Sequence, residues 1–152
     1  MATVYGVNRT LARTGTVNTI DPEEIGSDVK WLYETYTFLT TEAAGDIIQM
    51  GAIDIPVGAR IVDWVMDHGD LANNRTLSLG FAGTGLAAVL MAATDCGAAA
   101  DKKNMTDDGV SLSTGYEITD VTDGGKVILT LAGGAAAAVQ VRLMIRFVCK
   151  GA

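Results

Sequence analysis

The stretch that decides the fold is residues 45–80, AGDIIQMGAIDIPVGARIVDWVMDHGDLANNRTLSLG. Apolar residues fill nearly every position from Asp46 to Ile55, until Pro56 and Gly58 interrupt the run. Proline presets a turn and lacks a backbone donor, and glycine accepts positive φ, so the chain is expected to reverse here. Residues 62–67 then alternate between apolar and acidic with a period of two, which predicts a strand with one face in water. A polar turn at residues 70–74 and a third strand at residues 76–80 complete the stretch.

The same signals continue along the rest of the chain. Further strands are expected at residues 30–38, 116–121, 126–131 and 138–148, with a short helix at Leu86–Ala93, a helical turn at Asp21–Glu24 and a loop at Gly97–Gly109. About eight short strands separated by turns predict an all-β fold, an antiparallel sandwich or barrel. We expect a jelly-roll-like antiparallel β-sandwich with at most one or two short helices. The domain division would be an extended N-terminal arm (1–20) and one β-sandwich domain (21–152).

Composition and charge limit the partners. The first 20 residues carry +2 from Arg9 and Arg13, so the other 132 carry −9 of the net −7. An acidic body disfavours duplex nucleic acid, whose phosphates need a dense basic face. Only 19% of residues are charged, which is low for the surface of a free monomer. We therefore expect a homo-oligomer, with a trimer as the first expectation.

The arm is the expected partner-binding segment. Its apolar residues are too widely spaced to bury a face, and such segments are ordered only when something binds them. An intermolecular partner is expected to contact Tyr5, Val7, Arg9, Leu11 and Arg13.

No leader or membrane span is expected, since the longest apolar run, Leu86–Ala93, has eight residues and a span needs about 20. Cys96 and Cys149 are expected to be free thiols in a protein made in reducing cytosol.

Candidate chemistry is weak throughout. The glycines of residues 80–85 follow the order GxxGxG, which misplaces them for a dinucleotide loop, so a glycine-rich strand exit is expected. Asp63 and Asp67 would share one strand face and His68 the opposite face, so these three and Asp70 are interpreted as a solvated strand edge rather than a metal site. His68 is the sole histidine, and no serine lies in a nucleophile elbow. We expect no enzyme activity, no cofactor and no metal.

Aromatic residues concentrate in two of the expected strands and are interpreted as filling the core rather than a ligand-stacking surface. They are Trp31, Tyr33, Tyr36, Phe38 and Trp64.

Residues 55–62 and 76–80, IPVGARIV and TLSLG, resemble small virion proteins of tailed phages, of the head decoration or cement type. The likeness extends more loosely to residues 29–37 and 139–147. It implies a structural protein of the virion, assembled in the host cytoplasm, that binds the outer surface of the major capsid protein lattice and also binds itself as a homotrimer. Nucleic acid and membrane are not implied partners. The alternatives are another virion part (tail, neck or head-fibre base) and a carbohydrate-binding β-sandwich module.

Overall fold

The computed structural model describes residues 29–149 except 41, 73, 111–114, 121, 123 and 134–136, and the side chains of residues 52 and 53 are also outside the description. Nine strands are described, all antiparallel to their neighbours, and no helix occurs among the described residues. The strands are β1 (Val29–Thr37), β2 (Ile47–Ile55), β3 (Arg60–His68), β4 (Thr76–Phe81), β5 (Met91–Asp95), β6 (Asp101–Asn104), β7 (Tyr116–Glu117), β8 (Gly125–Ala132) and β9 (Gln140–Val148).

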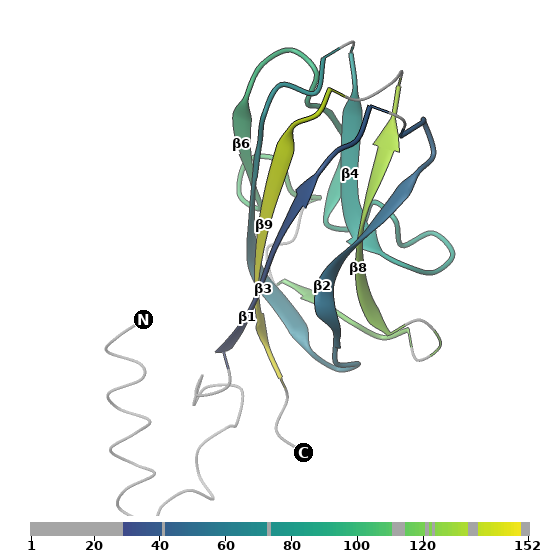
Figure 1. The fold of residues 1–152 in the computed structure, drawn as a ribbon. Helices are drawn as coiled ribbons and strands as arrows, with labels where there is room; N and C mark the ends of the chain where they lie inside the picture. Colours follow the sequence, from purple (N-terminus) through teal and green to yellow (C-terminus); the bar gives the residue numbers. More distant parts are fainter. Residues whose placement is uncertain are drawn as a thin grey trace, which may run out of the picture.

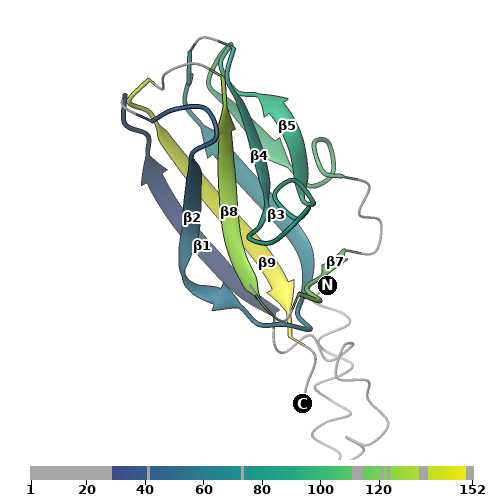
Figure 2. The ribbon, with the colours of Figure 1, turned by 90° about the vertical axis from the view of Figure 1, so that its right-hand side faces the viewer.

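Two sheets face each other, as the sequence predicts for a jelly-roll-like sandwich. One has the order β1-β9-β3-β6, with β7 also paired to β3, and the other has the order β2-β8-β4-β5. Figure 1 shows the sheets side by side, and in Figure 2 the sheet containing β2, β8 and β4 lies in front of β1, β9 and β3. Successive strands cross repeatedly between the sheets, so both layers depend on contacts that are distant in sequence.

The core lies between the sheets because the inward positions alternate along each strand. In β9 the odd-numbered residues from 141 to 147 are buried, and in β4 Leu77, Leu79 and Phe81 are fully buried. Trp64 and Met66 of β3 face them. Burial of such side chains stabilises the fold by about 1.5–3 kcal/mol each.

The reversal at Pro56 is confirmed. Ala59 N donates to Pro56 O at 3.1 Å, and Gly58 has φ +85°, a value that suits glycine. The register with β9 then shifts between Ile61 and Asp63, so Val62 is an extra residue that is 39% exposed rather than inward like Trp64.

Two expected elements are wrong. Residues 86–93 form turns leading into β5 rather than a helix, because their backbone bonds go to other segments: Leu90 N donates to Leu79 O, and Leu90 O accepts from Val110 N. An eight-residue helix is marginal without such competition. The expected loop at Gly97–Gly109 contains β6, which pairs with β3. The helical turn expected at Asp21–Glu24 lies outside the described residues.

Candidate functional site

The most distinctive surface of the described chain is the outer face of the sheet formed by β1, β9, β3 and β6. We call it the outer face, and it consists of three rows of residues that lie side by side across the strands. The rows are Trp31, Arg146 and Asp63; Tyr33, Met144, Val65 and Asn104; and Thr35, Arg142, Asp67 and Lys102.

Exposed aromatic residues mark this face, which corrects the expectation that both lie in the core. Trp31 is 54% exposed and Tyr33 is 63% exposed, whereas Phe38 and Trp64 are buried and Tyr36 is half-buried. In β1 the inward positions are the even ones, so Trp31 and Tyr33 share the outward positions with Thr35 and Thr37.

In the first row Trp31, Arg146 and Asp63 form one contact. The guanidinium carbon of Arg146 lies 4.7 Å from the centroid of the Trp31 ring, and its Nη2 donates to Asp63 Oδ2 at 3.0 Å. A cation–π contact at an exposed site contributes about 0.5–1 kcal/mol. One ring face of Trp31 is therefore covered by the protein itself.

The third row is held less tightly. Arg142 Nε lies 3.9 Å from Asp67 Oδ2, which is too long for a hydrogen bond, and about half of each side chain is exposed. Lys102 makes no ion pair with any residue that the structure describes. By contrast, Lys103 donates to Asp101 at 2.8 Å, which lowers the pKa of the Asp101 carboxyl and raises that of Lys103.

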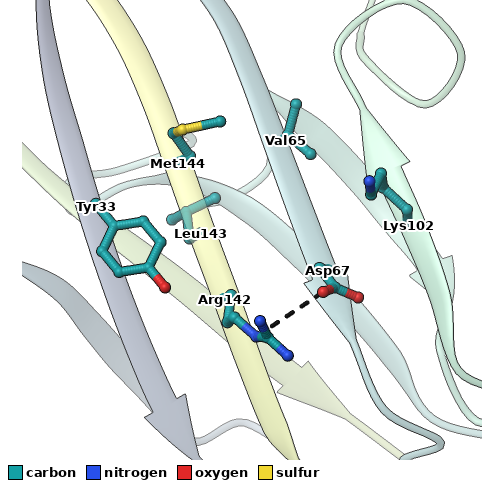
Figure 3. A pocket seen from close by; sticks show the side chains of 7 residues that line it. All are labelled: Tyr33, Val65, Asp67, Lys102, Arg142, Leu143 and Met144. Carbon is teal, nitrogen blue, oxygen red and sulfur yellow. Dashed lines mark ion pairs between the residues drawn. The ribbon is translucent and has the colours of Figure 1, made fainter.

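Between these residues lies a shallow depression of about 190 Å³ (Figure 3). The lining side chains come from four strands, β1, β9, β3 and β6, and include Tyr33, Val65, Asp67, Lys102, Arg142 and Met144.

The sequence prediction about Asp63, Asp67 and His68 is confirmed in its geometry. Both carboxylates lie on the outer face, while His68 points inward. His68 is not on a solvated edge as expected, however, because it is only 2% exposed, with Nδ1 2.9 Å from Gly69 O. Within the described ranges no three His, Cys, Asp or Glu residues gather as metal ligands would, and no helix there is long and apolar enough to cross a membrane.

The glycine-rich segment at residues 80–85 is a strand exit, as expected. Phe81 N donates to Leu86 O at 2.9 Å, and an added Cβ at Gly80 would lie 2.1 Å from that same oxygen. The following loop thus covers the space that a bound phosphate would need.

The five residues expected to bind a partner through the arm lie outside the described residues. They are Tyr5, Val7, Arg9, Leu11 and Arg13. Sequence reasoning missed the outer face, although a signal was present: residues 140–148 alternate strictly, with Arg142, Met144 and Arg146 on one side and apolar residues on the other.

The same fold occurs in phage capsids. A chain of the capsid of Ralstonia phage GP4 matches with a TM-score of 0.64 and 24% identity over 83% of this chain and 87% of that one. A chain of the cyanophage Pam1 capsid asymmetric unit matches with a TM-score of 0.61 and 21% identity over 80% and 85%. A chain of the capsid of the Helicobacter pylori bacteriophage KHP30 matches with a TM-score of 0.60 and 14% identity over 82% and 90%.

These three likenesses extend over most of each chain, and at such identities they concern the fold. No protein-family model matches the sequence, and no curated protein matches it.

Proposed function

We propose that this chain is a structural protein of a tailed-phage virion, which binds the outer surface of the major capsid protein lattice and stabilises the head. The observation that carries the proposal is the fold, shared over at least 80% of this chain with chains of three phage capsids. The resemblance of residues 55–62 and 76–80 to head decoration proteins supports the same function from the sequence.

Attachment would depend on the arm, residues 1–20. Tyr5, Val7 and Leu11 would bury apolar surface against the capsid protein, at roughly 25 cal/mol per Å² before the entropic costs of binding. Arg9 and Arg13 would pair with carboxylates or carbonyls of that partner. Because the rest of the chain carries −9, this +2 segment is the part best suited to an acidic partner.

Stabilisation of the head needs no reaction. A protein that binds the assembled shell but not its separated subunits shifts the equilibrium toward the shell by mass action. Many copies at equivalent sites would add their effects.

The test uses heads purified without this protein. Full-length chain should sediment with them and raise their disruption temperature, whereas a chain lacking residues 1–20 should stay in the supernatant. Arg142→Gln is the matched control, since it removes one positive charge from the outer face instead of the arm. Equal binding by the shortened chain would refute attachment through the arm, and no binding by the full chain would refute the proposed location.

Location in the tail, neck or head-fibre base is separated by copy number. Densitometry of purified particles should give a fixed, high ratio to the major capsid protein. A single ring of subunits per particle would contradict the decoration function.

A further inference from the structure

The depression on the outer face has no role in the proposed attachment. It combines one open aromatic ring with charged groups that are not fully paired. Such a combination is unusual on a surface that serves only to be soluble, because an exposed aromatic side chain leaves apolar area in water.

Tyr33 supplies the flat apolar element. Its side chain lies on edge strand β1 and is 63% exposed. Figure 3 shows the ring nearly face-on, lying beside Arg142, so one face of the ring is open to solvent. A pyranose ring offers a matching surface, since its axial C–H groups form an apolar face that packs on an aromatic ring. Tyrosine also carries a hydroxyl that can hydrogen-bond at the rim of such a contact.

Arg142, Asp67 and Lys102 supply the polar elements in the adjacent row. Because Arg142 Nε and Asp67 Oδ2 are 3.9 Å apart, both groups keep hydrogen-bonding capacity. The three charges sum to +1 at this point of a chain whose net charge is −7. A planar guanidinium matches the two oxygens of a carboxylate, and Lys102 adds a second donor.

The size and chemistry favour a sugar residue over a protein partner. A volume of about 190 Å³ corresponds to roughly six water molecules, a space for one ring rather than a chain segment. Protein interfaces have cores that are depleted of charged residues. Here Arg142, Arg146, Asp63 and Asp67 occupy the central strands of the face.

We propose that this depression binds one acidic sugar residue of a polysaccharide, with the pyranose ring stacked on Tyr33. Arg142 and Lys102 bind its carboxylate, and Asp67 accepts a hydrogen bond from a ring hydroxyl. The site is independent of the arm, so a virion protein attached through residues 1–20 would present it outward.

The experiment is a titration of the full-length protein, free of particles, followed by isothermal calorimetry and by ¹⁵N-resolved NMR. The probes are galacturonate oligosaccharides and, as the neutral counterpart of the same length, maltooligosaccharides. We expect binding of the acidic probe, with shifts confined to the residues of the depression, and at least about tenfold weaker binding of the neutral one.

Tyr33→Ala and Arg142→Gln should each weaken binding of the acidic probe by about tenfold or more. Ile47→Ala is the matched control, because Ile47 is 62% exposed on the other sheet's edge strand, β2. It should bind like the unmodified chain.

Three outcomes would overturn the proposal. The first is no binding at millimolar probe. The second is binding that Tyr33→Ala leaves unchanged, which would show charge attraction alone. The third is protection of Tyr33 and Arg142 from solvent by other subunits on the particle, which would make the outer face a protein interface. Because the titration needs no particle, its failure leaves the proposed attachment untouched.

Discussion

Gly80 is the position at which one added methyl group should most disturb the sandwich. It is buried in β4 beneath the loop of residues 82–90. An added Cβ would lie 2.1 Å from Leu86 O and 2.6 Å from the carbonyl carbon of Ala87, whereas ordinary contact begins at 3.4 Å. The oxygen alone would have to retreat by 1.3 Å, the difference between 3.4 and 2.1 Å. Both obstacles are backbone atoms, so no change of rotamer relieves the clash.

The cost follows from what holds the loop in place. Leu86 O accepts from Phe81 N at 2.9 Å, and Leu90 N donates to Leu79 O at 3.1 Å. Weakening these two bonds costs about 1 kcal/mol each, and overpacking adds about 1–3 kcal/mol. Gly80→Ala should therefore lower the free energy of unfolding by about 3 kcal/mol, and Tm by roughly 6–12 °C for a domain of this size.

The assay is equilibrium urea denaturation of the full chain, checked by calorimetry. Gly85→Ala is the control in the same loop, because nothing lies within 4 Å of its added Cβ and only its φ of +78° opposes alanine. That backbone strain should cost about 1–2 kcal/mol. Equal losses for the two variants, or a loss below about 0.5 kcal/mol at Gly80, would show that the loop does not lie against β4 as described.

Light scattering of the isolated protein should give an oligomer, a trimer first of all, and a clean 15.8 kDa monomer would contradict the expectation drawn from low surface charge. Burial raises the pKa of the Cys96 thiol to about 11, so Cys96 should react with a thiol reagent only after unfolding while half-buried Cys149 reacts in the native protein; two fast thiols would refute this. Arg75→Met should raise the free energy of unfolding by about 1 kcal/mol or more, because the guanidinium is fully buried with no hydrogen-bond partner in the described structure. A lower free energy of unfolding in urea would instead show that the charge is compensated. Asp63→Asn should change that free energy by less than about 1 kcal/mol, since its ion pair is about one-third exposed.

The strands that sequence reasoning found are those whose own pattern reveals burial. Residues 47–55 and 140–148 carry enough apolar residues to predict a strand without knowledge of the partner strand. β6, with the sequence DKKN, has no such pattern and low strand propensity. It is a strand because β3 offers it hydrogen bonds at the sheet edge, and pairing between segments more than 30 residues apart is not visible in either one.

The candidate site was missed for a different reason. Trp31 and Tyr33 were assigned to the core by residue type, although they share the outward positions of β1 with Thr35 and Thr37. Position in the alternation was the better guide than hydrophobicity. The depression itself could not have been predicted, because its lining comes from four strands whose order in the sheet depends on the whole fold.

The charges on the outer face bear on which part of the molecule stays open to water. Asp63 and Asp67 face Arg146 and Arg142 across β3 and β9, with the same spacing on both strands. These half-exposed pairs contribute little to stability, and the alternation of buried residues already fixes the register. A face buried against another protein would have to desolvate all four charges, at a cost that such pairs seldom recover. Attachment through the arm leaves them hydrated, and so the arm and the outer face can serve two different partners in one small domain.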